Sequence, residues 1–335
     1  MAYTTIDDSE AYFQVVTYAG DGSANHAITL PGDTDMQPDL VWIKNRDQTD
    51  SPCLFDAVRG ATKVIKSDSG DAEATDADTL DSFTSDGFQV DADVKVNTNT
   101  ENYVAWCWKE SATAGFDIVA ADGTGSARTQ AHSLSAVAEW IFVKEISTDG
   151  SWYTYTAMMG NTKAMFLNAT NAVSGDSSGY WNDTTPTSSV FSLGTDGGVN
   201  QSSTGYIFYL WRSVQGFSKF GKFVGNGHAT NGPFVYTGFQ PAWILVKRAI
   251  GGTGNWMLVD NKRPGYNHGD YYKYDFKINN NDAERSSVTS ADFFSNGFKV
   301  RTDSTDWNVS GDTYIYMAFA RAPFVNSNGV PCNAK

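Results

Sequence analysis

The residues whose types and spacing come closest to a chemical site are the carboxylates within residues 68–81. Six acidic side chains occur there: Asp68, Asp71, Glu73, Asp76, Asp78 and Asp81. Calcium ions take carboxylate and carbonyl oxygens from loops of this kind. However, the spacing does not follow the EF-hand pattern, and no later stretch repeats this acidic density. We therefore interpret the segment as a solvated acidic loop and expect no metal site, with calcium binding as the alternative.

Histidine-based catalysis has little support in the sequence. The four histidines are His26, His132, His228 and His268, and none lies near a serine nucleophile motif. The chain contains no GxSxG, HExxH or P-loop sequence. A polysaccharide-degrading enzyme needs two carboxylates facing a groove, and the sequence singles out no such pair. We expect a protein that is not an enzyme and uses no cofactor, although a triad can assemble from distant residues.

Two Asp-x-x-Arg pairs are more informative. They are Asp56 with Arg59 and Asp260 with Arg263. At the matching positions between them the chain has Thr156 and Met159, so acid and base are lost together. A local ion pair that braces a turn behaves in this way, because half of a buried pair costs more than losing both partners. We interpret both pairs as structural, with an arginine that grips an anionic ligand as the alternative.

Aromatic residues in polar, loop-like surroundings are the candidates for binding. They are Tyr180, Trp181, Tyr266, Tyr271 and Tyr272. Tyrosine and tryptophan favour protein interfaces because one side chain combines a large apolar face with a polar group, and the ring faces also stack on sugars. We predict that these side chains contact a ligand or partner. The alternative is partial burial beneath their own loops.

The elements that would position these residues recur three times. An apolar run ending in lysine occurs at residues 40–44, 140–144 and 243–247. Three further sequence features recur at nearly the same spacing, and all four features keep the same order in each copy. The other three are an opening strand at Phe13, Phe116 and Phe220, a two-residue step ending in Asn97, Asn200 and Asn308, and a closing strand at Tyr103, Tyr206 and Tyr314. The repeat length is about 104 residues. We predict three tandem repeats, at residues 1–110, 111–213 and 214–335.

Composition and turn signals indicate strands. Aromatic residues make up 14% of the chain and Gly is abundant. No amphipathic stretch with helical periodicity is longer than about three turns. Asp86-Gly87 and Asn296-Gly297 predict tight hairpins. The apolar run of each repeat suggests a strand buried on both faces, and its lysine is expected to mark the point where the strand reaches water. The expected fold is all-β, with one antiparallel β-sandwich per repeat of jelly-roll or immunoglobulin-like type, which the sequence does not separate.

Charge and cysteine content narrow the choice of partners. The formal net charge is −14 and no run of Lys and Arg is present, which argues against nucleic acid and anionic membrane surfaces. The three cysteines, Cys53, Cys107 and Cys332, form no metal or disulfide pattern. The N-terminus lacks the pattern of a signal peptide and no apolar run reaches membrane-spanning length, so we expect neither secretion by a signal peptide nor membrane insertion.

Several strings resemble a repeat module of bacteriophage and prophage virion proteins, common in marine and environmental phages. They include PDLVWIKNR (38–46), DAVRG (56–60), SDGFQV (85–90), NYVAWCWK (102–109), TPTSSVFSLG (185–194), GFSKFGKFVGNG (216–227) and NGPFVYTGFQPAWILVKR (231–248). The resemblance spans about residues 13–324 and brings no catalytic residues with it. It implies a virion structural protein, assembled in the host cytoplasm together with other virion proteins.

Two functions follow from this resemblance. The first is a tail-fibre or tail-associated protein that binds a host-surface glycan or receptor. The second is a capsid decoration (cement) protein that binds the major capsid protein, which suits an acidic chain without a fibre stalk. The resemblance also implies a homo-oligomer, and the alternative is that three copies in one chain replace a trimer.

Overall fold

The structure is a computed structural model that describes residues 2–263, 274–286 and 290–332. Within these residues the regular elements are almost all antiparallel strands, joined into six sheets. The helical elements are single turns: η1 (Ser9–Ala11), α1 (Val94–Asn97), α2 (Ser178–Trp181) and α3 (Gly197–Asn200). The predicted all-β class is therefore confirmed. No helix in this described part is long and apolar enough to span a membrane.

The strands form three groups, each with one large and one small sheet. In the first group the large sheet has the order β1 (Phe13–Ala19), β9 (Asn102–Trp108), β3 (Leu40–Asn45), β4 (Cys53–Asp56), β5 (Lys63–Lys66) and β6 (Ala74–Thr75). Its small sheet has the order β2 (His26–Thr29), β8 (Gly87–Val90) and β7 (Leu80–Thr84). The hairpin predicted at Asp86-Gly87 joins β7 to β8, with Thr84 opposite Gly87.

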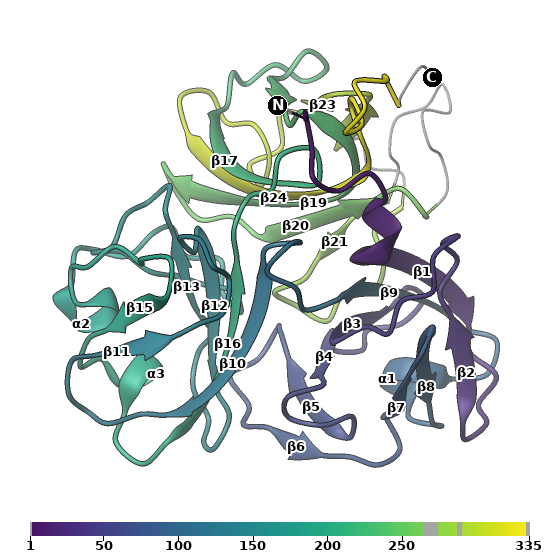
Figure 1. Cartoon of the computed structure of the whole chain (residues 1–335), viewed down its shortest axis with the longest axis horizontal. Coiled ribbons are helices and arrows are strands. Elements are labelled where there is room, and N and C mark those ends of the chain that lie inside the picture. The colour runs from purple at the N-terminus through teal and green to yellow at the C-terminus, as the bar shows by residue number, and fades with distance from the viewer. Residues whose placement is uncertain (1, 264–273, 287–289, 333–335) are drawn as a thin grey trace.

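The large sheets of the second and third groups repeat the order of the first five strands of the first group's large sheet. The second has β10 (Phe116–Asp122), β16 (Gly205–Trp211), β12 (Trp140–Glu145), β13 (Tyr153–Thr156) and β14 (Met165–Phe166), with a small sheet of β11 (Arg128–Ala131) and β15 (Val190–Leu193). The third has β17 (Ser218–Val224), β24 (Thr313–Pro323), β19 (Phe239–Ile250), β20 (Trp256–Asp260) and β21 (Phe276–Lys277), with a small sheet of β18 (Phe234–Tyr236), β23 (Gly297–Val300) and β22 (Ala291–Phe294). The three groups surround a common centre (Figure 1).

The third opening strand begins earlier than the sequence pattern suggested. Ser218 lies opposite Phe319, just as Phe13 lies opposite Trp108 in the first group. Phe220 therefore takes the place of Val15 and not of Phe13. The misalignment arose because aromatic and serine side chains exchange at this edge position, so residue type alone misplaced the register by two.

Each large sheet is covered on both faces, which explains its consecutive apolar residues. In β3, Leu40 and Trp42 point into a central cluster shared by all three groups. The alternate residues, Val41 and Ile43, point into the core between the large and small sheets of the first group. Side chains alternate between the faces of a strand, so a strand with two covered faces has no polar positions.

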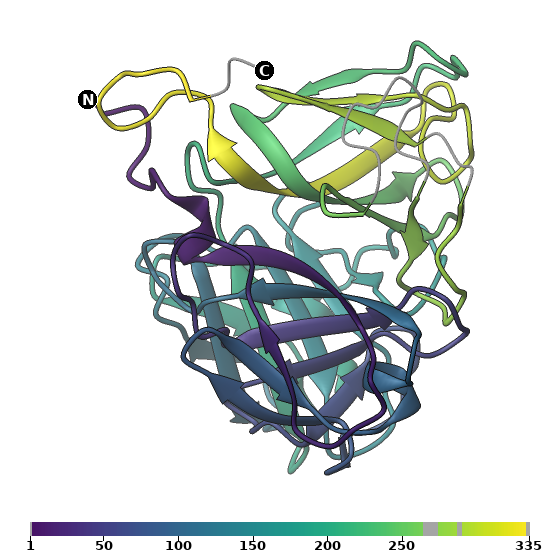
Figure 2. The same ribbon diagram turned by 90° about the vertical axis from the view of Figure 1, so that its right-hand side faces the viewer.

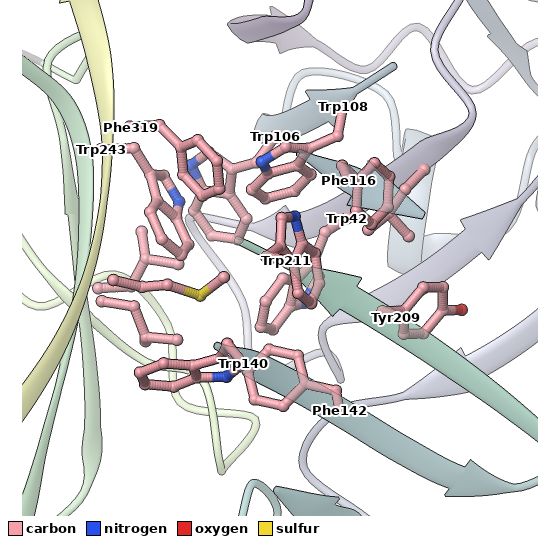
Figure 3. Packing of buried hydrophobic residues seen from close by; sticks show 14 of the residues in the cluster. Trp42, Trp106, Trp108, Phe116, Trp140, Phe142, Tyr209, Trp211, Trp243 and Phe319 are labelled. Atoms are coloured by element: carbon pink, nitrogen blue, oxygen red, sulfur yellow. The ribbon is translucent and has the colours of Figure 1, made fainter. Parts of the chain in front are cut away.

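The central cluster is rich in tryptophan and holds the three groups together (Figure 3). The ring of Trp108 lies 5.6 Å from that of Trp243 at an interplanar angle of 90°, and 6.4 Å from that of Trp211. One side chain of the first group therefore contacts rings of both other groups. Burial of each such side chain contributes roughly 1.5–3 kcal/mol. This shared core makes independent movement of the groups unfavourable.

A buried asparagine performs the same task in each group. The side-chain oxygen of Asn97 accepts from Asp21 N at 2.9 Å, and its nitrogen donates to Ser23 O at 2.9 Å. Asn200 and Asn308 make the corresponding bonds to the loops after β10 and β17. Buried polar groups need such partners, which accounts for the recurrence of asparagine at this step.

The N-terminal segment lies against the third group and beside the segment that follows β24 (Figure 2). The Tyr3 hydroxyl donates to Gly238 O at 2.6 Å. Farther along, the Ser327 amide donates to the Asp7 carboxylate at 2.6 Å. These contacts bring both ends of the described chain onto the third group, close to the pocket described below.

Candidate functional site

The two Asp-x-x-Arg pairs form buried ion pairs at boundaries between groups. Arg59 Nε lies 2.5 Å from Asp56 Oδ2, and Arg263 Nε lies 2.8 Å from Asp260 Oδ2. Each arginine also contacts a glutamate. The Arg59 Nη1–Glu73 Oε2 distance is 3.2 Å, and the Arg263 Nη1–Glu284 Oε1 distance is 2.9 Å. In both clusters the guanidinium is almost fully buried, so its carboxylate partners replace the water that it loses.

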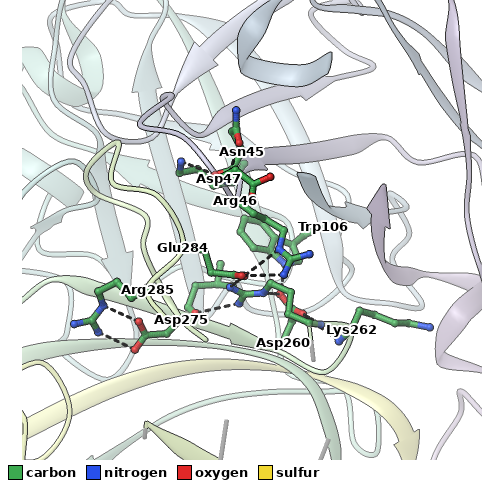
Figure 4. Close-up of polar contacts among 12 residues, drawn as sticks. Asn45, Arg46, Asp47, Trp106, Asp260, Lys262, Asp275, Glu284 and Arg285 are labelled. Carbon is green, nitrogen blue, oxygen red and sulfur yellow. Dashed lines mark hydrogen bonds and ion pairs between the residues drawn. The ribbon is translucent and has the colours of Figure 1, made fainter. Parts of the chain in front are cut away.

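Each aspartate also accepts a hydrogen bond from a neighbouring group. The Tyr209 hydroxyl, on β16 of the second group, donates to Asp56 Oδ2 at 2.6 Å. The Trp106 indole, on β9 of the first group, donates to Asp260 Oδ2 at 2.9 Å, and Figure 4 shows this contact beside Glu284. Burial is the main cause that raises the pKa of Tyr209 well above its ordinary value. This hydroxyl therefore stays protonated and acts as the hydrogen-bond donor to Asp56.

The boundary between the second and third groups replaces the whole cluster. Thr156 and Met159 occupy the positions of the acid and the base. Met317 occupies the donor position, because it lies opposite Leu245 as Trp106 lies opposite Trp42. Val173 takes the place of the glutamate, since its amide bonds to Ala249 O as the Glu73 amide bonds to Ile146 O. All four polar groups are thus absent together, and Met159 and Val173 pack against the central cluster.

The strand-ending lysines do not reach water as the sequence suggested. Lys44, Lys144 and Lys247 are fully buried. Each ammonium lies within hydrogen-bond distance of three backbone carbonyls, two in its own group and one in a loop of the adjacent group. The distances to Nζ are Asn45 2.8 Å, Gln48 3.3 Å and Asn281 3.4 Å for Lys44; Glu145 2.6 Å, Gly150 3.0 Å and Gly70 3.1 Å for Lys144; Arg248 3.0 Å, Gly254 2.8 Å and Thr170 3.0 Å for Lys247.

An ammonium has three donors, and three carbonyls satisfy them. Burial nevertheless lowers the pKa of Lys44 and Lys144 to about 8 and that of Lys247 to about 7. Because Asn281 belongs to the third group and Lys44 to the first, the third group closes back onto the first. The three boundaries therefore form a closed ring.

Of the predicted binding residues, the structure describes Trp181 and Tyr180. Trp181 is only 1% exposed, and its indole donates to Lys163 O at 2.7 Å. The prediction that Trp181 contacts a ligand is therefore wrong, because the single turn α2 directs its ring into the core of the second group. Tyr180 is half-buried beside Tyr153, at a ring distance of 5.8 Å. Tyr266, Tyr271 and Tyr272 lie outside the described residues.

The acidic segment at residues 68–81 is occupied by contacts with cationic side chains. Glu73 contacts Arg59 and Lys63, and Asp71 lies 2.9 Å from Lys66. Burial raises the pKa of Asp68. Within the described ranges, no three His, Cys, Asp or Glu side chains are grouped so that they could hold a metal ion.

A different set of aromatic residues is exposed, on the outer face of the third small sheet. Phe234 is 46% exposed, Tyr236 50% and Phe294 37%. The rings of Phe234 and Phe294 lie 5.9 Å apart in an edge-on arrangement. Together we call these three residues the aromatic face. Large apolar side chains grouped on a surface are typical of interaction sites.

The aromatic face has no counterpart in the first group. Tyr236 lies opposite Gly297 as Thr29 lies opposite Gly87, so the matching residues can be assigned. Phe234 corresponds to Ala27, Tyr236 to Thr29 and Phe294 to Thr84. Sequence reasoning missed these residues because it searched loops for aromatics. Alignment of the two Gly-containing hairpins would have revealed them.

A pocket of about 360 Å³ adjoins Tyr236. Its lining comes from the N-terminal segment, from the connection into β17 and the start of that strand, and from the end of β18 and the turn that follows it. These residues are Tyr3, Ser213, Gln215, Ser218, Lys219, Phe220, Tyr236, Thr237 and Gly238. The ammonium of Lys219 lies 5.3 Å from the centre of the Tyr236 ring and 3.0 Å from its carbonyl oxygen. Aromatic rings, hydroxyls, an amide and a cation thus converge at one place.

The fold and this surface define an all-β protein with a rigid, closed arrangement of sheets and an exposed aromatic face. The chain belongs to a family described as a domain of unknown function (DUF7483), whose match covers residues 8–323. No curated protein and no solved structure is detectably similar to it.

Proposed function

We propose that this chain is a bacteriophage virion structural protein of the tail-fibre or tail-associated type, which binds a host-surface glycan through the aromatic face and the adjoining pocket. The resemblance of its sequence strings to phage virion modules supports the first part. The exposed rings of Phe234, Tyr236 and Phe294 support the second.

The proposal includes an architecture of three tandem β-sandwich repeats at residues 1–110, 111–213 and 214–335. Three observations support it: the shared order of the large sheets, the equivalent asparagines, and the equivalent lysine contacts at every boundary. In this architecture the chain takes the place of a trimer through pseudo-threefold packing, and the repeats present a stiff block from which one surface contacts the host.

The observation that carries the binding role is the replacement of small residues by rings at matched positions. The exposed part of each ring stays in water and so gains no stability for the folded state from burial. Their flat faces, together with hydroxyl, amide and ammonium groups, suit a ligand that has both apolar and polar faces, as a sugar does. The pocket volume also lies within the range of small-ligand sites, ~300–1,000 Å³.

Binding without hydrolysis is the expected mode. The lining of the pocket, as described, contains no Asp or Glu, whereas a glycoside hydrolase needs two carboxylates beside the scissile bond. The buried carboxylates Asp56 and Asp260 are paired with arginines. We expect no release of reducing sugar from a glycan that the protein binds.

Adsorption of the purified protein to susceptible host cells tests the binding role. We expect saturable adsorption that the variant F234A/Y236A/F294A loses by at least about tenfold, as for central interface residues. The matched variant A27S/T29A/T84A changes the corresponding positions of the first group and should adsorb normally. Equal adsorption of both variants, or none by the unmodified protein, would contradict the proposal.

Cryo-electron microscopy of the virion tests the location. Density at the tail for the closed arrangement of three strand groups supports the proposal. Density on the head shell would instead favour the capsid decoration role, with the major capsid protein as partner.

A further inference from the structure

We infer that the glycan bound at the aromatic face is anionic, with carboxylate or sulfate groups along its chain. This inference rests on the proposed function and specifies its ligand. It starts from the distribution of charge. Residues 214–335 contain 13 Lys and Arg against 9 Asp and Glu, whereas residues 1–110 contain 7 against 21. The exposed rings therefore lie in the cationic third of a strongly acidic chain.

Two lysines flank the aromatic face. Lys299 lies directly opposite Phe234 in the pairing of β18 with β23, so the two side chains share the outer surface of the sheet. The acid on the same surface, Asp292, also lies opposite Lys299. Its carboxylate is 2.5 Å from Arg301 Nε, so an arginine already neutralises it. The charge of Lys299 is thus available to a ligand lying on the Phe234 ring.

The second lysine is at the pocket end of the same surface. Lys219 Nζ donates one hydrogen bond, to Tyr236 O at 3.0 Å. An ammonium has three donors, so within the described part of the chain two of them remain for a ligand. Phe234 and Tyr236 are two residues apart on one strand and face the same side. A polymer lying along β18 therefore contacts two aromatic rings, with an ammonium group beside each of them. This arrangement matches a chain of sugars that carries a negative charge at regular intervals.

The negative charge on the rest of the molecule would also orient an anionic polymer as it approaches. The first group repels an anionic polymer, while the third attracts it, so the field of the whole protein favours approach to the aromatic face. Such an interaction weakens as salt increases, because both lysines are partly exposed to solvent. A neutral glycan would use the rings and gain nothing from this arrangement.

The test measures binding of the full chain to polygalacturonate and to dextran sulfate, with methyl-esterified polygalacturonate and dextran as neutral partners of matched backbone. We expect tighter binding to the anionic member of at least one pair, weakened by salt. The variant K219Q/K299Q should lose about tenfold, consistent with two exposed charge interactions. The variant K66Q/K163Q removes the same charge from other surfaces and should bind normally.

Equal binding within both polymer pairs, no binding to either anionic polymer, or equal loss in the two lysine variants would overturn the inference. A carboxylate ligand is distinguished from a sulfate ligand by which anionic polymer binds more tightly. If F234A/Y236A/F294A still loses adsorption to host cells while the charge pairs make no difference, the proposed glycan-binding role stands and only the anionic ligand is wrong. If no variant affects host adsorption, the proposed role fails as well.

Discussion

Tyr209 donates its hydroxyl hydrogen to Asp56 across the boundary between the second and first groups, at 2.6 Å. The two residues are far apart in the sequence, yet Asp56 holds Arg59 from the other side. Trp106 has the same relationship to Asp260 and Arg263. An unpaired buried charge is costly, so this cluster is stable only when complete, and the third boundary lacks all of it.

Removal of Asp56 alone should therefore be severe. We expect D56A to lower the free energy of unfolding by ~3–5 kcal/mol, because Arg59 stays buried without its main partner. The quadruple variant D56T/R59M/E73V/Y209M installs the residues found at the apolar boundary: Thr156, Met159, Val173 and Met317. It should recover most of the loss, since an apolar set of similar volume replaces a complete charge cluster. Urea unfolding measures both, and a quadruple variant less stable than D56A would contradict this account.

The buried lysines should make stability depend on pH. Burial lowers the pKa of Lys247 to about 7, below the 10.5 expected in the unfolded chain. Between these values the unfolded state binds more protons, so the free energy of unfolding contributed by this site rises with pH. The cost of K247M should therefore grow between pH 7 and pH 10. At the upper end we expect about 2–4 kcal/mol, because the buried carbonyls around the amine lose their donor.

Denaturant titrations of the wild type and K247M at several pH values give this difference directly. K63M, which changes a lysine on β5 whose side chain is 36% exposed, is the control and should have a small effect. A cost of K247M that stays constant or falls with rising pH would show that the ammonium remains charged in the folded state.

Glu110 should act in the opposite sense. Burial, and then the neighbouring Asp117, raise its pKa to about 7. The folded state therefore holds this proton more tightly than the unfolded state, so the stabilisation is complete below about pH 4.5 and is lost as pH rises through 7. E110Q should match the wild type near pH 5 and exceed it in stability at pH 8. Thermal unfolding at the two pH values tests this, and equal differences at both would exclude a raised pKa.

How much of the fold could be predicted depended on the range of the interactions. The apolar runs before Lys44, Lys144 and Lys247 indicated strands with two covered faces, because periodicity is a local property. The burial of these lysines was not predictable, because the acceptors that permit it include carbonyls of distant loops, such as Asn281 for Lys44.

The candidate site was harder to predict, for the same reason. The joint loss of Asp and Arg at Thr156 and Met159 indicated an ion pair. The hydrogen bond from Tyr209 to this pair is recognisable only once the sheets are arranged in space. The exposed ring of Tyr236 lies in a regular strand, where composition predicts burial. Only comparison with Thr29 at the matching position shows that it is unusual.

Trp181 provides the clearest separation between stability and binding. It is 1% exposed, its ring lies 5.5 Å from that of Tyr155, and its indole donates to Lys163 O. We expect W181A to lower the free energy of unfolding by ~3–5 kcal/mol through the cavity it leaves. Adsorption to host cells, measured on the remaining folded protein, should be unchanged. Y236A should behave in the reverse manner, because its ring is half exposed. Loss of adsorption in W181A without loss of stability would return Trp181 to the binding site.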